Sequence, residues 1–136
     1  MESLRQRLAG VSIFSGLPDD VLDGFVTNGS TVKYPSGSEI VREGAQEAGL
    51  HLILSGQAEV AVGGKVVASL GPGEYFGEIA VIDGGPRSAT VRAAGDEPTK
   101  TFRISPAGFW AVVGDNPTAL RQLLISVAGI LRNQQG

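Results

Sequence analysis

Two different spacings of apolar residues divide this chain into a middle part and two ends. In the middle, the stretch "LHLIL" (50–54) carries a leucine at every second position, and "QAEVAV" (57–62) alternates polar and apolar residues. A period of two residues is the pattern of a β-strand with one face turned toward a core. The pair Gly63–Gly64 predicts a tight hairpin turn, because such turns need positive φ angles.

Short apolar stretches separated by glycines continue through most of the middle part. We expect further strands near residues 30–34, 38–42, 65–70, 88–94 and 99–104. Many short antiparallel strands predict an antiparallel β-roll, that is, a barrel or jelly roll of the double-stranded β-helix type. The predicted fold class is therefore mainly β with flanking helices.

The two ends of the chain are predicted to be helical. Pro18 is compatible with a first helical turn, and the two aspartates after it suit the positive end of the helix dipole. A shorter helix is expected over 106–113, followed by a long one in which Asn116 is a good N-cap and Pro117 the first helical residue. Its apolar positions recur at helical spacing: Leu120, Leu123, Leu124, Val127 and Leu131.

Composition and charge narrow the classes of function. With 136 residues, 42% hydrophobic and 18% charged, the chain is expected to form one globular domain. The net charge of −3 and the scattered lysines and arginines argue against direct binding to DNA or to an anionic membrane. No apolar run has the length of a membrane span, the start does not fit a signal peptide, and there is no cysteine. We therefore expect a cytoplasmic protein without disulfides or thiol catalysis.

The stretch "FGEIAVIDGGPRSATVRA" (76–93) brings charge into the most apolar part of the chain. Gly-Glu-Ile-Ala from Gly77, followed by Pro-Arg-Ser-Ala-Thr-Val from Pro86, resembles the phosphate-binding cassette of the cyclic nucleotide-binding domain family. "SIFSGLP", "KYPSGSEIVREG", "LILSGQAEV" and "LGPGEYFGE" also resemble that family, so the similarity covers nearly the whole chain.

The resemblance implies a single cyclic nucleotide-binding domain over 1–136. Its parts would be an N-terminal helical segment (1–28), a β-roll with the cassette (29–105) and two C-terminal helices (106–134). The chain is then either a free-standing sensor or one domain of a longer protein.

A cyclic nucleotide offers one anionic phosphodiester, a ribose 2′-hydroxyl and a flat base, and the cassette has chemistry for the first two. Gly77 lacks a Cβ, so a phosphate can approach backbone N–H groups, and a short helix expected over 78–82 adds further donors. Arg87 adds a planar fork of charged donors that a lysine does not reproduce. Glu78 is an acceptor suited to the 2′-hydroxyl.

The resemblance implies the same three roles and adds further ligand contacts. At the positions that match the family motif, the amides of Ala80 and Ala89 and the hydroxyl of Ser88 would contact the phosphate. Ile79 belongs to the same motif.

Each charged residue also has a simpler explanation. Arg87 would serve as a structural arginine paired with Asp83 or Glu78, and Glu78 would simply favour a helix start. These explanations do not account jointly for Gly-Glu and Pro-Arg-Ser-Ala in one register, so we favour the binding site.

The pocket for the base is predicted from the resemblance alone. In the family the base lies against the β-roll, and the matching positions are Val60, Val67 and Leu70, for which a core role is equally compatible. Counting from Asn116 as in the bacterial catabolite activator branch, the base-reading positions are Gln134 and Gln135, where that branch carries hydroxyl residues. An exposed, frayed helix end is the alternative for both glutamines.

Ser88 and the single histidine narrow the choice of ligand. Family members that favour cyclic GMP often carry threonine after the cassette arginine, and this chain has Ser88, so we expect cyclic AMP ahead of cyclic GMP. His51 is expected to have a surface or partly buried structural role. One histidine without cysteine does not build a metal site of the cupin type, so we expect no metal.

These features predict a regulatory module, not an enzyme, because no pair of nucleophile and base is visible. Ligand capture would shift the C-terminal helix, in which Gly129 lowers helix stability by about 1 kcal/mol relative to alanine. The apolar stripe of that helix is also compatible with a homodimer, and the effector is not identified by the sequence. The competing class is a structural interaction module, a β-roll whose vestigial cassette binds a partner protein instead of a nucleotide.

Overall fold

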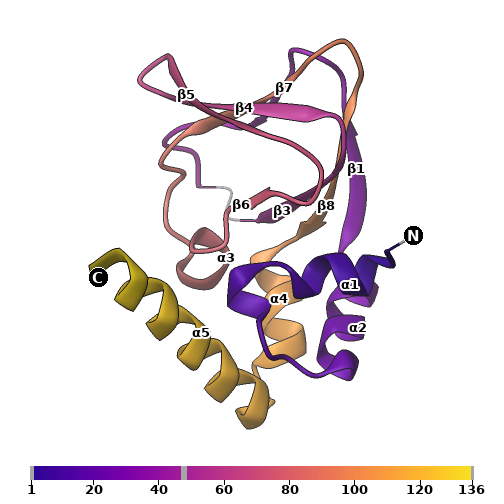
Figure 1. Cartoon of the computed structure of the whole chain (residues 1–136), viewed down its shortest axis with the longest axis vertical. Coiled ribbons are helices and arrows are strands. Elements are labelled where there is room, and N and C mark those ends of the chain that lie inside the picture. Colours follow the sequence, from indigo (N-terminus) through magenta and orange to yellow (C-terminus); the bar gives the residue numbers. More distant parts are fainter. Residues whose placement is uncertain (1, 47–48, 136) are drawn as a thin grey trace. The chain divides into compact units, whose positions relative to one another are not determined.

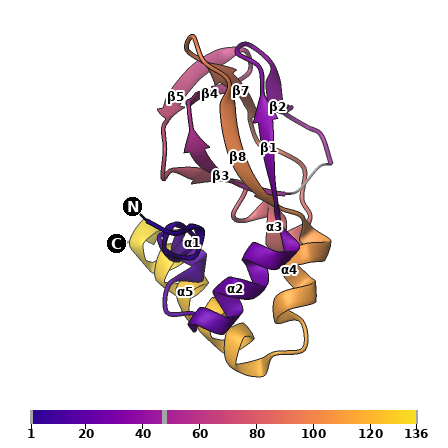
Figure 2. The same cartoon turned by 90° about the vertical axis from the view of Figure 1, so that its right-hand side faces the viewer.

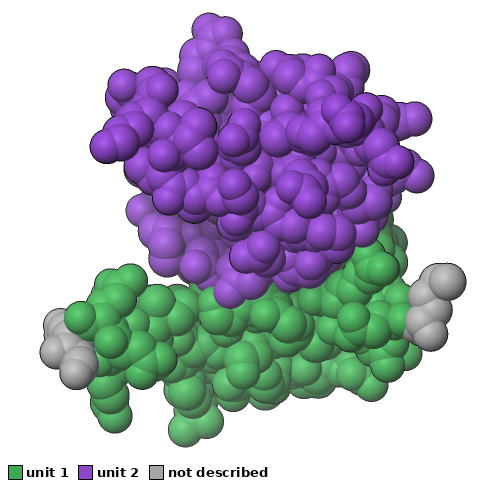
Figure 3. All heavy atoms as spheres, turned by 45° about the horizontal axis from the view of Figure 1, so that its top comes forward, with its two compact units in different colours: residues 1–28, 107–136 green, residues 29–106 purple. Residues whose placement is uncertain are grey.

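A computed structural model describes residues 2–46 and 49–135 of the chain, except the side chain of Gln135. The chain divides into two compact units (Figure 3). Unit 1 combines both ends of the sequence, 1–28 and 107–136, whereas unit 2 is the continuous segment 29–106. The description of the chain as a single domain over 1–136 stays a prediction.

Unit 2 contains two antiparallel sheets of four strands each, with the orders β1-β8-β3-β6 and β2-β7-β4-β5 (Figure 1). The strands are β1 (Ser30–Tyr34), β2 (Glu39–Val41), β3 (Leu50–Ser55), β4 (Gln57–Val62), β5 (Lys65–Leu70), β6 (Tyr75–Phe76), β7 (Thr90–Ala94) and β8 (Thr99–Ile104). Apart from the β4–β5 hairpin, neighbouring strands in each sheet are not consecutive in the sequence, as in a β-roll. The predicted β-roll is confirmed.

Alternation along the strands of the second sheet builds one side of the core. In β7, Val91 and Ala93 are buried while Arg92 between them is exposed. Together with inward residues of β2, β3 and β4 they form one cluster: Ile40, Val41, Ile53, Ala58, Val91 and Ala93. Burial of this apolar surface is what holds the four segments together.

The β4–β5 hairpin carries two local features. Gly63 and Gly64 have φ angles of 60° and 83°, so both turn residues are left-handed, as the glycine pair predicted. Farther along, Val60 pairs with Ala68 and Ala61 pairs with Val66. Val67 is therefore an extra residue in a β-bulge, which changes where its side chain points.

The short helix α3 (Ala80–Asp83) follows β6 in unit 2. It begins two residues later than the predicted range of 78–82, with Ile79 as its N-cap residue, and Gly77 before it has a φ of 88°, outside the helical region. Gly84, with a φ of 68°, ends the helix in the left-handed conformation.

Unit 1 is helical, with five segments in its described residues (Figures 1 and 2). They are α1 (Leu4–Ala9), the 3₁₀ turn η1 (Ser12–Phe14), α2 (Asp19–Asn28), α4 (Pro106–Val113) and α5 (Pro117–Gln135). Asn116 caps α5 as predicted, since its Oδ1 accepts a hydrogen bond of 3.1 Å from the amide of Ala119. Three stacked rings form the centre of the unit, with Phe25 lying 4.5 Å from Phe14 and 5.7 Å from Phe109 between ring centroids.

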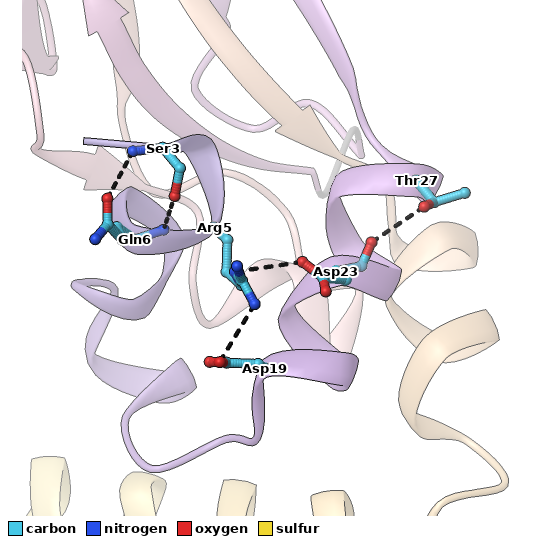
Figure 4. Close-up of polar contacts among 6 residues, drawn as sticks. All are labelled: Ser3, Arg5, Gln6, Asp19, Asp23 and Thr27. Carbon is cyan, nitrogen blue, oxygen red and sulfur yellow. Dashed lines mark hydrogen bonds and ion pairs between the residues drawn. The ribbon is translucent and has the colours of Figure 1, made fainter. Parts of the chain in front are cut away.

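Polar contacts add detail at the surface of unit 1 (Figure 4). Ser3 and Gln6 cap α1 by two reciprocal bonds of 2.8 and 3.1 Å. Arg5 forms ion pairs with Asp19 at 3.2 Å and Asp23 at 3.5 Å, which join α1 to α2. Because these charges are exposed, the aromatic centre contributes more to stability than the pairs do.

The carbonyl of Ser15 connects η1 to α5 within the same unit. It accepts hydrogen bonds of 3.1 Å from Nε2 of Gln122 and 3.1 Å from Oγ of Ser126, which lie one turn apart on α5. The two bonds fix the rotation of α5 about its own axis relative to η1.

Candidate functional site

A cavity of about 470 Å³ opens in unit 2 beside α3. Eight residues predicted as ligand contacts from three separate stretches line it: Val60, Gly77, Glu78, Ile79, Ala80, Arg87, Ser88 and Ala89. Residues near positions 60, 77–80 and 87–89 are thus brought to one place by the β-roll. Their contact with a ligand stays a prediction.

Gly77 lies where the chain leaves β6 and turns toward α3. Its φ of 88° belongs to the region that favours glycine. A Cβ at this position would also overlap the carbonyl oxygen of Gly49 and Nη1 of Arg87. Glycine is therefore required twice, once by the backbone angle and once by the atoms packed against it.

Arg87 is the charged side chain at the wall of the cavity, and it is buried, with 6% of its surface exposed. Its Nη2 donates a hydrogen bond to the carbonyl of Gly49. Its own amide donates to the carbonyl of Ala45 at 3.0 Å, and its carbonyl accepts from the amide of Gly44 at 2.8 Å. The segment between β2 and β3 thus fixes both the backbone and the guanidinium of Arg87.

Glu43 and Thr90 hold that segment in place. The amide of Glu43 donates to Oγ1 of Thr90 at 2.9 Å, and Oε1 of Glu43 accepts from the amide of Gly63 at 3.0 Å. The start of the β2–β3 segment is therefore tied to β7 on one side and to the β4–β5 hairpin on the other. The sequence motif gave no signal for these supporting contacts, because they join residues 20 to 47 positions apart.

Two carboxylates line the cavity with Arg87. Glu78 is half-buried directly after Gly77, and Asp83 is exposed at the end of α3. Oδ1 of Asp83 accepts a hydrogen bond of 2.8 Å from the amide of Gly85, which fixes this carboxylate at the turn before Pro86. Asp83 was considered from the sequence only as a possible partner of the arginine.

Apolar side chains form the rest of the wall. Val41, Phe76 and Val91 line the cavity with Val60, and the sequence did not single out the first three. Val67 lies at the β-bulge with 58% of its surface exposed, and Leu70 packs against the core cluster. Neither is among the described residues that line the cavity, so their predicted contact with the base has no support from this geometry.

Gln134 lies exposed near the end of α5 in unit 1. The side chain of Gln135 lies outside the described part of the chain. The predicted base-reading role of both glutamines stays a prediction.

His51 is fully buried, so the expectation of a surface or partly buried position is wrong. Its ring stacks on Phe76 with 4.9 Å between centroids, its edge meets Tyr34, and Nδ1 lies 3.0 Å from Oγ1 of Thr101. Burial, with the nearby charges of Arg87 and Arg103, lowers the pKa of His51 to about 3. His51 is therefore uncharged at neutral pH and supports the strand from which the cassette begins.

Two structural findings bear on other classes of function. Within residues 2–46 and 49–135, no group of three or more His, Cys, Asp or Glu side chains is arranged to hold a metal ion. In the same part of the chain, no helix combines the length and apolar character that a bilayer crossing requires.

Comparison with known proteins places this geometry in a family. The model of the cyclic nucleotide-binding domain matches residues 31–116. The match covers most of the chain and includes all of the described residues that line the cavity. The chain belongs to the cyclic nucleotide-binding domain family.

The relatives include a regulatory subunit of one protein kinase and a second protein kinase. A cAMP-dependent protein kinase regulatory subunit of Emericella nidulans is 35% identical over 94 residues, which are 68% of this chain and 22% of that protein. A cGMP-dependent protein kinase of Eimeria tenella is 41% identical over 101 residues, which are 74% of this chain and 10% of that protein. This chain therefore spans well under two thirds of these relatives.

Solved structures confirm the fold. The N-terminal domain of a transcriptional regulator from Streptomyces coelicolor A3(2) superposes with a TM-score of 0.82 at 24% identity, covering 98% of this chain and 95% of that one. The catabolite activator protein of Thermus thermophilus gives a TM-score of 0.72 at 29% identity, covering 91% of this chain and 60% of that one.

Proposed function

We propose that this chain is a regulatory module that binds cyclic AMP in the cavity beside α3. The observation that carries the proposal is the convergence of Gly77, Glu78 and Arg87 on one cavity, with Arg87 buried in its wall. A charge-assisted hydrogen bond to a guanidinium is stronger in a buried setting than in water, so an anionic ligand suits this position. The family match supports a cyclic nucleotide as that ligand.

In this proposal each part of the ligand meets its own part of the site. Arg87 would offer its guanidinium to the phosphate from the wall of the cavity, where Nη2 also donates to the carbonyl of Gly49. Because Gly77 has no Cβ, the phosphate can come close to the backbone of the cassette. The carboxylate of Glu78 would accept a hydrogen bond from the ribose 2′-hydroxyl. The base would find apolar contacts at Val41, Val60 and Val91.

The choice of cyclic AMP over cyclic GMP depends on Ser88. Ser88 stands where family members that favour cyclic GMP often carry threonine, and it lines the cavity. The relatives include proteins named for either nucleotide, so the family match supports the cyclic phosphate more strongly than it supports the base.

The proposed output of the module is a shift of α5. Leu124 and Leu131 lie one heptad apart on this helix with 71% and 54% of their surfaces exposed, which supports contact with an effector or a second copy of the chain. The net charge of −3 supports a partner other than nucleic acid. A role without catalysis is supported by the site, whose polar residues suit binding.

Calorimetric titration of the purified chain with cyclic AMP and with cyclic GMP tests the proposal. We expect heat of binding and thermal stabilisation with both ligands, with the tighter binding for cyclic AMP. Tighter binding of cyclic GMP would overturn the choice of base alone. Absence of heat and of stabilisation with either nucleotide would leave the structural interaction module as the better account.

A further inference from the structure

The described residues that line the cavity carry more negative than positive charge, which is unusual for a site that binds an anion. Among the described residues that line it, Arg87 carries one positive charge, whereas Glu78 and Asp83 carry one negative charge each. The formal charge of the lining is therefore −1. Such a site attracts an anion only where the anion lies close to the arginine and to backbone N–H groups.

This imbalance acts differently on ligands of different charge. A cyclic phosphodiester carries one negative charge, whereas a linear 5′-monophosphate carries nearly two at neutral pH, because its second pKa is about 6. The second charge finds no second arginine among the described lining residues and faces the two carboxylates. At equal distance, the carboxylates should therefore repel the dianion about twice as strongly as the singly charged phosphodiester.

Asp83 is separable from the residues proposed to hold the ligand. Glu78 is proposed to accept a hydrogen bond from the ribose, and this role already accounts for its charge. Asp83 instead uses Oδ1 to accept from the amide of Gly85 at 2.8 Å, and an asparagine oxygen would accept the same bond. The hydrogen bond from Gly85 therefore requires an oxygen at position 83 but does not require its negative charge.

We propose that Asp83 is a specificity-determining residue that selects singly charged cyclic phosphodiesters against doubly charged linear monophosphates. The inference rests on the proposed function and concerns the same cavity. It gives the module a way to distinguish a cyclic nucleotide from the product of its hydrolysis, which has the same base and sugar and one more charge.

The test compares Asp83→Asn with the wild-type chain. Dissociation constants are measured for cyclic AMP and 5′-AMP at about pH 7.5, where the monophosphate is mostly dianionic. The matched control is Asp96→Asn, which removes the same charge from an exposed turn outside the cavity. The pair cyclic GMP and 5′-GMP is titrated in the same way.

Removal of the Asp83 charge should strengthen binding of the monophosphate by roughly two- to fivefold more than binding of the cyclic nucleotide, a range typical of exposed charge interactions. A gain of affinity separates this role from structural damage, which weakens both ligands. The difference should shrink at about 1 M salt and at about pH 5, where screening or protonation of the monophosphate removes the repulsion.

Unchanged selectivity in Asp83→Asn, or an equal change in Asp96→Asn, would overturn the inference while leaving the proposed function intact. Failure of the wild-type chain to bind either cyclic nucleotide would instead remove the proposed function, and the inference with it.

Discussion

The space that a Cβ of Gly77 would fill is occupied by Nη1 of Arg87. The two residues are ten positions apart, and their contact lets the guanidinium lie directly against the cassette backbone. Gly77 thus leaves the space in which Arg87 lies, and its positive φ sets the course of the main chain.

The first prediction concerns Gly77→Ala. The left-handed angle alone costs about 1–2 kcal/mol, and the added methyl group also pushes Arg87 from its position. We expect cyclic AMP affinity to fall by about 2 kcal/mol or more, which is roughly thirtyfold, measured by calorimetry.

Gly73→Ala is the matched control for this change. Gly73 has the same φ of 88°, and a Cβ there meets nothing within 4 Å. The control should lose similar backbone stability and keep its affinity. Equal losses of affinity in the two variants would show that strain, and not the contact with Arg87, is responsible.

The second prediction concerns Arg87 itself. Arg87→Ala should weaken cyclic AMP binding by about 2–5 kcal/mol, the range for truncating one partner of a buried charged pair. Arg87→Lys should recover only part of the loss, because a lysine lacks the planar fork. Arg92→Ala, which removes an exposed arginine of β7, is the control and should bind normally. Wild-type affinity in Arg87→Ala contradicts the assignment.

The contrast between the motif and its supports shows what the sequence could predict. Gly77, Glu78 and Arg87 lie within eleven consecutive residues whose order is itself a signal, so they could be recognised before the fold was known. Their supports, Ala45 and Gly49, act through backbone carbonyls, to which any residue type contributes. No side-chain pattern marks such contacts.

A third prediction separates the ribose from the phosphate. Glu78→Gln should weaken cyclic AMP binding by roughly 1 kcal/mol, because the amide oxygen still accepts the hydrogen bond but lacks the charge that strengthens it. A 2′-deoxy analogue should bind the variant and the wild-type chain almost equally, because it lacks the hydroxyl. Glu59→Gln, on an exposed position of β4, provides the control. Equal losses for both ligands would mean that Glu78 acts through the fold.

The fourth prediction concerns stability against acid. His51 has a folded pKa of about 3 and an ordinary value of 6.5, so below pH 6.5 the unfolded chain binds a proton that the folded chain does not. Above pH 6.5 this difference in proton binding does not affect the free energy of unfolding. As the pH falls from 6.5 toward 3, it lowers the stability of the folded chain. Between about pH 7.5 and pH 5 the loss should reach about 2 kcal/mol in denaturant titrations.

His51→Gln provides the comparison for the acid effect. The variant lacks the stack on Phe76 and should be less stable overall, but its stability should stay nearly flat across that window. A wild-type chain with the same flat profile would contradict the assignment of the proton to His51.

His51 also shows where sequence periodicity failed. A strand with leucine at every second position predicts one buried face, and the histidine then belongs to the other. In the structure both faces of β3 are covered: Leu50 and Leu52 are buried on one face, and His51 and Ile53 on the other, where Ile53 joins the core cluster with residues of the second sheet. A period of two residues identifies the strand but not the number of its faces that are covered.

The fifth prediction concerns α5. If this helix is the output element, its amides over 120–135 should change hydrogen-exchange protection when cyclic AMP is added, because the bonds from Gln122 and Ser126 to Ser15 must rearrange. The strands over 50–62 should change much less. Exchange is measured at two protein concentrations, each with and without ligand. Protection that depends on protein concentration but not on ligand would identify α5 as a dimer interface instead.

The course of the chain between the two units has a practical consequence. Unit 2 is one uninterrupted segment, and its first strand residue, Ser30, pairs with Arg103 near its end. The two points at which the chain enters and leaves the segment therefore lie side by side. Segments with adjacent ends tolerate transplantation into a surface loop of another protein. Residues 29–106 thus have the form of a graftable insert, which could carry the cavity intact into a fluorescent reporter.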